Sequence, residues 1–208
     1  MESGGVMSSG YVSERQSVKK ELRACVRRKK KQYTAECLSE WSLSLCRSLM
    51  SDGLWLAARV VLLYHSLPDE VDTASLLAAA SHDGKTVLLP MVKGDDLELR
   101  VYDGEDSLSL GAYGIYEPCG VLFPESRYGE VDLVVVPGMA FDAYGHRLGR
   151  GKGYYDRLLP KLSKAHRTGL CFPFQMVDEV PSEPHDVRMS EVVCQNMTCG
   201  SCDSSKKV

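Results

Sequence analysis

Apolar residues follow two patterns along this chain, a helical spacing and short continuous runs, which predict helices and strands. Leu38, Trp41, Leu45 and Leu49 are three or four positions apart, which predicts an amphipathic helix with one buried face. Short apolar runs at residues 59–64, 86–92, 97–101, 131–136 and 167–172 predict strands. We therefore expect an α/β fold, with three layers (α/β/α) around a mostly parallel central sheet.

The segments between these runs predict the remaining elements. We expect a helix that starts near Ser13 or Ser17, because either side chain is a good N-cap. Asp72 and Thr73 are expected to cap a helix that buries Leu76. Residues 108–127 should be irregular, with a loop near a site at 113–118, and further expected elements are a helix at about 151–162, a helical turn at 175–180 and a polar loop at 181–187.

Length and composition indicate a single catalytic domain. The 208 residues suffice for one buried core, and we expect a disordered leader at 1–12, the domain at 13–196 and a flexible Cys/Ser/Lys tail at 197–208. No apolar run reaches the roughly 20 residues of a membrane span, and the N-terminus lacks the apolar core of a secretory signal. We expect a cytoplasmic monomer with no membrane partner, in which the eight cysteines are reduced thiols.

The first expected helix carries a strongly basic stretch that ends at Lys31. Such a run invites the hypothesis of a nucleic-acid-binding protein. Acidic residues are interleaved with it, aromatic residues are few, and the net charge of the whole chain is −3. A solvated helix face with one or two ligand-facing cations therefore explains the run better, and we expect no nucleic-acid partner.

A glycine-rich stretch at residues 134–159, VVVPGMAFDAYGHRLGRGKGYYDRLL, follows the strongest predicted strand. Arg147, Arg150 and Lys152 alternate with glycines there, which favours a backbone-lined pocket for an anion such as a phosphate chain. A Walker A loop would need glycine at position 146 and Ser or Thr at position 153, and a Rossmann loop would not alternate strictly. A tight strand-to-helix turn explains two of the glycines but not the interleaved cations.

This stretch closely resembles the central motif of the 5-formyltetrahydrofolate cyclo-ligase family, also called methenyltetrahydrofolate synthetases. Three further blocks are similar to that family in the same order: Lys19-x-x-Leu22-Arg23, the run from Tyr64 to Thr73, and Pro184-His185-Asp186-Val187. Together the four blocks extend from about residue 17 to residue 195. The leader and the cysteine-bearing end of the chain depart from the family pattern.

The resemblance implies an ATP- and Mg²⁺-dependent ligase. ATP would phosphorylate the formyl oxygen of 5-formyltetrahydrofolate, N10 would attack the formyl carbon, and phosphate would leave to give 5,10-methenyltetrahydrofolate. Positioning and charge neutralisation dominate such phosphoryl transfer. The implied ATP ligands are Lys19, Arg23, Arg147, Leu148, Gly149, Arg150, Gly151, Lys152, Gly153, Tyr154 and Tyr155, with Arg150 and Lys152 as the catalytic pair. The implied folate ligands are His65, Glu70, Arg150, Gly151, Lys152, Gly153 and Tyr154, and the implied metal ligands are Asp156 and Asp186.

Several assignments have a competing interpretation. Lys20 matches a phosphate ligand as well as Lys19 does on composition alone, and His65 and His146 fit loop histidines better than general bases. Asp142 is either a supporting carboxylate or a turn residue. Cys199-x-x-Cys202 lacks the second pair of a zinc site and favours inert thiols. A phosphosugar isomerase-like enzyme is a second candidate function, by analogy of fold.

Overall fold

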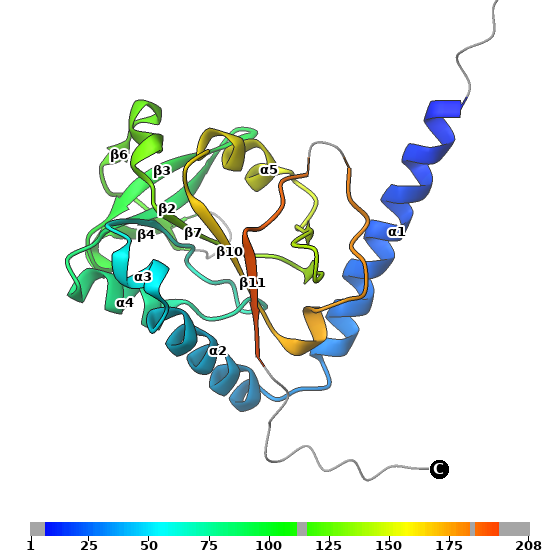
Figure 1. The fold of residues 1–208 in the computed structure, drawn as a ribbon, viewed down its shortest axis with the longest axis horizontal. Helices are drawn as coiled ribbons and strands as arrows, with labels where there is room; N and C mark the ends of the chain where they lie inside the picture. Colours follow the sequence, from blue (N-terminus) through cyan, green and yellow to red (C-terminus); the bar gives the residue numbers. More distant parts are fainter. Residues whose placement is uncertain (1–6, 112–115, 184–185, 196–208) are drawn as a thin grey trace, which may run out of the picture.

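The computed structural model describes residues 7–111, 116–183 and 186–195, with side chains from Glu14 onward. Within this part of the chain, a seven-stranded sheet has the order β11-β10-β7-β1-β2-β3-β6 (Figure 1). The strands from β11 to β2 are parallel, whereas β3 and β6 are antiparallel to their neighbours, so the prediction of a mostly parallel sheet is confirmed. The bounds are β1 Val60–Leu62, β2 Thr86–Lys93, β3 Asp96–Tyr102, β6 Leu122–Phe123, β7 Leu133–Val136, β10 His166–Cys171 and β11 Glu191–Cys194.

Helices cover both faces of this sheet because its central strands are apolar on both sides. Val61 points into one core and Leu62 into the other. The first core packs under α1 (Met7–Lys30), α2 (Ala35–Met50), α3 (Gly53–Ala57) and α4 (Ala74–His82). The second packs under α5 (Tyr154–Leu158) and the 3-10 turns η3 (Glu125–Glu130) and η4 (Leu159–Lys161), which confirms the α/β/α fold class.

Helix α2 confirms the predicted apolar face. Trp41, Leu45 and Leu49 are buried and Leu38 packs against them, and each buried apolar side chain contributes about 1.5–3 kcal/mol to the free energy of unfolding. Thr34 caps the helix by accepting a hydrogen bond from the amide of Cys37. Among the described residues, no helix is long and apolar enough to cross a membrane.

Three helical predictions need correction. Helix α1 already begins at Met7, before Ser13 and Ser17, so residues 7–12 are helical where we expected a disordered leader. Thr73 occupies the N-cap position of α4, but its hydroxyl donates to the carbonyl of Tyr64, and Asp72 accepts from the amide of Ala74 instead. The helix expected from about residue 151 starts at Tyr154, because Gly153 has a left-handed backbone.

The strand predictions also need changes. Residues 116–118, expected to lie in a loop, form strand β5 (Tyr116–Pro118), which pairs with β4 (Leu108–Leu110); residues 113–115 lie outside the described part of the chain. The turn expected at 175–180 is instead η5 (Pro173–Gln175), which begins at a proline that favours helical φ. The partly buried strand β11, for which the sequence predicted no element, pairs beside β10 at the sheet edge. Three smaller elements lie in the described part of the chain: η1 (Glu105–Ser107) and the paired strands β8 (Ala140–Phe141) and β9 (Arg147–Leu148).

Candidate active site

A cleft of about 850 Å³ lies beyond the carboxyl ends of β1 and β7, between helix α1 and residues 145–153 of the glycine-rich stretch, which we call the glycine loop. Ligands of open parallel sheets bind at this edge. The described residues that line the cleft are Gln16, Ser17, Lys19, Lys20 and Arg23 from α1, Leu67 and Glu70 after β1, Pro137 and Gly138 after β7, the continuous run from Arg147 to Asp156, and Glu183 and Asp186. The four sequence blocks thus meet in one cavity.

The glycine loop has a backbone that needs glycine at two positions. Gly151 and Gly153 have φ values of 102° and 68°, which side-chain-bearing residues rarely adopt. A Cβ at Gly151 would lie 3.5 Å from the guanidinium of Arg23, and the Nε of Arg23 donates to the carbonyl of Gly149 at 2.8 Å. The loop is therefore held against α1 through its own main chain, as a backbone-lined anion pocket requires.

Lys19 lies inside the cleft between two carboxylates. Its Nζ is 2.8 Å from Glu183 Oε2 and 2.9 Å from Asp186 Oδ2, and its side chain is 12% exposed. Burial lowers the pKa of Lys19, but the hydrogen bonds and charges of the two carboxylates outweigh it, so the net pKa is raised. Lys19 is a permanent cation at neutral pH, which is the state that a phosphate ligand needs.

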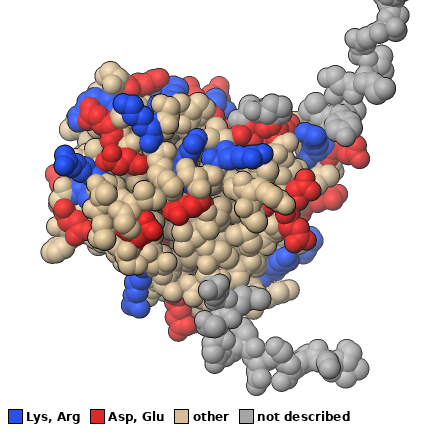
Figure 2. All heavy atoms as spheres, in the orientation of Figure 1, with Lys and Arg blue, Asp and Glu red and all other residues tan. Residues whose placement is uncertain are grey.

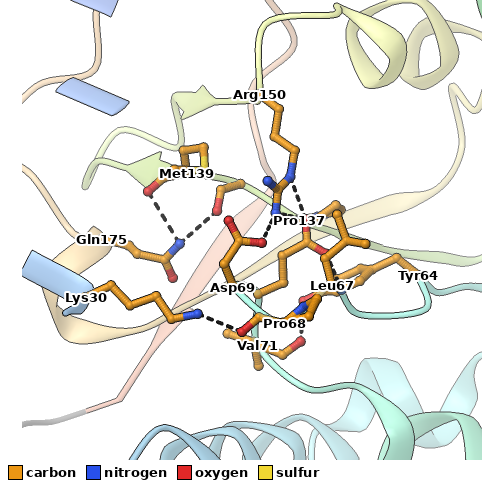
Figure 3. Close-up of polar contacts among 12 residues, drawn as sticks. Lys30, Tyr64, Leu67, Pro68, Asp69, Val71, Pro137, Met139, Arg150 and Gln175 are labelled. Atoms are coloured by element: carbon orange, nitrogen blue, oxygen red, sulfur yellow. Dashed lines mark hydrogen bonds and ion pairs between the residues drawn. The ribbon is translucent and has the colours of Figure 1, made fainter. Parts of the chain in front are cut away.

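Arg150 joins the glycine loop to the loop after β1. Its Nε and Nη2 donate to Glu70 Oε1 at 3.1 and 3.0 Å. Nη2 also contacts Asp69, as Figure 3 shows. Burial lowers the pKa of Arg150, yet both carboxylates raise it overall, and Arg150 lowers the pKa of Asp69 against the effect of burial. The Nζ of Lys30 donates to the carbonyl of Pro68 at 2.8 Å and fixes the same loop to the end of α1.

Arg147 lines the cleft with a side chain that is almost fully buried and ion-paired. Its side chain is 4% exposed, and its two Nη atoms donate to Asp156 at 2.9 Å and to the carbonyl of Pro137 at 3.2 Å. The guanidinium also lies 5.5 Å from the centre of the Tyr155 ring. Burial raises the pKa of the Tyr155 hydroxyl, so this phenol stays protonated at neutral pH.

Lys152 and Lys20 differ from the other cations of the cleft. Neither ammonium group has an ion pair or a side-chain hydrogen bond to a residue in the described ranges. The carbonyl of Lys152 does accept from Arg157 at 3.1 Å, so the backbone at this position is held while the charge is available. Lys20, which composition alone could not separate from Lys19, is thus a cation of the same cleft.

The structure brings together all but one of the predicted site residues. His65 is the exception, since it does not line the cleft and its ring packs 5.7 Å from that of Tyr116. His146 also lies outside the cleft; its Nδ1 is 2.9 Å from the fully buried Asp142, which accepts further hydrogen bonds from the amides of Tyr144, His146 and Val180. Asp142 and His146 therefore fix the start of the glycine loop from outside the cleft.

Sequence reasoning missed several lining residues. Glu183 carried a weak signal, because it lies three positions before Asp186 in the same polar loop, but its partner Lys19 is 164 residues away. Pro137 and Gly138 directly follow the strongest strand, where a lining position is expected. The Nε2 of Gln175 donates to the carbonyl of Gly138 at 2.8 Å and to that of Met139 at 3.4 Å, which fixes this backbone. Figure 3 shows Gln175 directed at Met139.

The cleft has two carboxylates, Asp156 and Asp186, that match the number of carboxylate ligands Mg²⁺ needs beside a phosphate. Among the described residues there is no group of three or more His, Cys, Asp or Glu side chains that could hold an ion by themselves. Mg²⁺ needs only one or two carboxylates when phosphate oxygens and waters fill its other positions. Asp156 and Asp186 both line the cleft, where Arg147 and Lys19 neutralise them.

An α/β fold with a cationic, glycine-lined cleft at the carboxyl ends of its strands is typical of enzymes that bind phosphate-bearing ligands. Residues 15–195 match the model of the 5-formyltetrahydrofolate cyclo-ligase family. The chain therefore belongs to this family, which confirms the resemblance seen in the sequence.

Individual relatives agree with this assignment. The chain is 31% identical over 195 residues to the probable 5-formyltetrahydrofolate cyclo-ligase of Schizosaccharomyces pombe, covering 84% of this chain and 94% of the relative. It is 33% identical over 164 residues to the 5-formyltetrahydrofolate cyclo-ligase of Mycolicibacterium smegmatis, covering 76% and 84% respectively. The solved structure of the Aquifex aeolicus 5,10-methenyltetrahydrofolate synthetase superposes with a TM-score of 0.75 at 30% identity, over 91% of this chain and 100% of that chain.

Proposed function

We propose that this protein converts 5-formyltetrahydrofolate to 5,10-methenyltetrahydrofolate with ATP and Mg²⁺, releasing ADP and phosphate. A formyl oxygen is a poor leaving group, whereas a phosphorylated oxygen departs readily when N10 attacks the carbon. Transfer of the γ-phosphoryl group needs alignment and cations more than covalent chemistry from the protein. The cleft offers both.

The observation that carries this proposal is the bridge from Arg150 to Glu70. It joins the loop that would hold the phosphates to the loop that the family resemblance assigns to folate. The two reacting molecules would meet at this junction, where Arg150 can turn from a carboxylate to a developing phosphate charge. Reactants held in this way gain the large effective concentrations of intramolecular reactions.

The roles of the other residues follow from their contacts. Lys152 would bind the transferred phosphoryl group, because its ammonium has no competing ion pair among the described residues. Lys19, Arg23 and the amides of the glycine loop would hold the remaining phosphates. Arg147, being buried, would act by positioning Asp156.

The proposed sites for Mg²⁺ and for the pterin ring each follow from contacts that these residues make now. Asp156 and Asp186 would hold Mg²⁺, which would supply charge neutralisation on the phosphate oxygens. Each carboxylate would exchange a cationic partner for the metal, since both are ion-paired now. The guanidinium of Arg157 lies 5.5 Å from the centre of the Tyr154 ring, so the pterin would stack on the opposite face of that ring.

The competing functions explain less of the cleft. A phosphosugar isomerase needs a phosphate loop but has no use for Lys19 and Arg23, which line the same cavity from α1. A nucleic-acid-binding protein would use the exposed part of the basic run and would not need the glycine loop. On the face shown in Figure 2, cationic and anionic side chains are interspersed, which does not favour binding to a polyanion. That the protein acts as a cytoplasmic monomer stays a prediction.

Absorbance of the methenyl product tests the proposal. The purified protein is mixed with 5-formyltetrahydrofolate, and ATP and Mg²⁺ are added together or separately. We expect turnover with both present and none when ATP is omitted or the metal is chelated. No absorbance change with authentic substrate, Mg²⁺ and either adenine or guanine nucleotide would rule the proposal out.

A further inference from the structure

Two cysteines far apart in the chain lie side by side in the central sheet. Cys171 ends β10 and Cys194 ends the edge strand β11, and the two residues are direct partners in the parallel register. Neighbouring strands lie about 4.8 Å apart, and disulfides join residues whose Cα atoms are about 4.4–6.8 Å apart. Both side chains belong to the same core, so they point to the same face of the sheet.

The two sulfur atoms have unequal environments. Cys171 is fully buried, whereas Cys194 is half-buried on a strand with a single neighbour in the sheet. The side-chain interaction with Cys194 raises the pKa of Cys171, with burial adding to the rise, and the same interaction lowers the pKa of Cys194 against the effect of burial. The Cys194 thiol itself donates to the carbonyl of Gln195 at 3.6 Å. Cys194 is therefore the better nucleophile and the more accessible sulfur.

We propose that Cys171 and Cys194 form a reversible disulfide when the protein meets a small-molecule disulfide as oxidant. The Cys194 thiolate attacks one sulfur of the oxidant, forms a mixed disulfide and releases one small thiol. Cys171 then attacks the Cys194 sulfur and displaces the second small thiol. Two protein thiols are oxidised and one small disulfide is reduced to two thiols, so atoms and electrons balance.

The cross-link would act on the wall of the cleft. It closes the chain between β10 and β11 into a loop, and this loop carries Glu183 and Asp186, the two partners of Lys19. A disulfide stabilises mainly by restricting the unfolded chain, with an effect that grows with the length of the closed loop. We therefore expect a higher melting temperature in the oxidised protein. We also expect Glu183 and Asp186 to move less relative to Lys19.

Four other thiols in the described part of the chain are Cys25, Cys37, Cys46 and Cys119. The sequence adds Cys199 and Cys202, which could compete for Cys194. A variant with both Cys199→Ser and Cys202→Ser removes this competition and leaves the proposed pair intact. Cys119, which is exposed, provides the matched control, since Cys119→Ser should leave cross-linking unchanged.

Peptide mapping by mass spectrometry after oxidation provides the test. The full chain and the double-serine variant are treated with oxidised glutathione, the remaining thiols are alkylated, and tryptic peptides are analysed. We expect the peptide with Cys171 linked to the peptide with Cys194 in both proteins. The linked form should melt roughly 5 °C higher or more, and dithiothreitol should reverse both changes.

Cys194→Ser provides the second variant, because a half-buried serine there should be tolerated better than one at Cys171. In this variant Cys171 should be alkylated only after unfolding and should never appear in a cross-link. Alkylation of both cysteines after oxidation, glutathione retained on Cys194, or Cys194 linked to another cysteine would each overturn the proposal. None of these outcomes depends on ligase activity, so the proposed function is tested separately.

Discussion

Arg150 donates two hydrogen bonds to Glu70, which lies 80 residues earlier in the chain. Glu70 in turn accepts a hydrogen bond from the amide of Leu67, so the loop after β1 is already folded to receive the guanidinium. This contact is the point at which the glycine loop and the loop after β1 become one site. It makes the geometry of each loop depend on the other.

Glu70→Gln should therefore reduce catalysis more than stability. The amide keeps the shape of the carboxylate but loses the charge that holds Arg150, and we expect kcat/KM for 5-formyltetrahydrofolate to fall about 10- to 100-fold. Asp69→Asn is the matched control, because Asp69 contacts the same guanidinium but does not line the cleft. Equal losses in both variants would show that the bridge merely neutralises Arg150.

Lys152→Ala should abolish turnover without affecting the fold. We expect kcat to fall at least about 100-fold, as when a group that stabilises transition-state charge is removed, with an unchanged melting temperature. The melting temperature should hold because the Lys152 ammonium has no ion pair among the described residues. Lys161→Ala, which removes an exposed pair with Glu125, serves as the control and should retain full activity.

Asp156→Asn and Asp186→Asn should each weaken the response to Mg²⁺. Loss of a carboxylate ligand should raise the Mg²⁺ concentration for half-maximal activity at least about tenfold. Stabilisation of the protein by MgADP, measured as the shift in melting temperature, should decrease in parallel. Asp83→Asn is the control, because Asp83 lies at the end of α4 and does not line the cleft, and it should show neither change. An unaltered Mg²⁺ response in both cleft variants would show that Asp156 and Asp186 are not metal ligands.

Asp142 should make the fold sensitive to acid. Burial raises the pKa of Asp142, but hydrogen bonds from Val180, His146 and Tyr144 outweigh it and hold the net pKa below its ordinary value. The folded state is then favoured at pH values above the unfolded pKa of about 3.9, and this contribution is lost as the pH falls through the lower folded value. The free energy of unfolding, measured between pH 6 and pH 3, should fall less steeply in Asp142→Asn than in the parent protein.

Much of the fold could be predicted because its signals are local. The spacing of Trp41, Leu45 and Leu49 and the apolar runs of the central strands each specify an element within a few residues. Strand β11 gave a weaker signal, since it is short and lies at the edge of the sheet, where fewer side chains are buried. Its place is determined by pairing with β10, which is a tertiary interaction.

The candidate site divides in the same way. The resemblance to the family, carried by four motifs in order, was enough to assign the glycine loop, Lys19, Arg23 and Glu70 to one site, and the structure places them in one cleft. The motifs could not indicate that Arg147 is buried against Asp156, or that Glu183 pairs with Lys19, because both contacts depend on how the chain packs in three dimensions. His65 packs beside Tyr116 and does not line the cleft, a placement that also depends on distant segments; its role in folate binding stays a prediction.

The fate of the formyl oxygen tests the central claim most directly. 5-Formyltetrahydrofolate labelled with ¹⁸O in the formyl group is converted with ATP and Mg²⁺ by the purified protein, and the released phosphate is analysed by mass spectrometry. Because the proposed reaction transfers the γ-phosphoryl group to that oxygen before it leaves, we expect one ¹⁸O atom in each phosphate produced. Unlabelled phosphate, with the ¹⁸O recovered in water, would contradict the account.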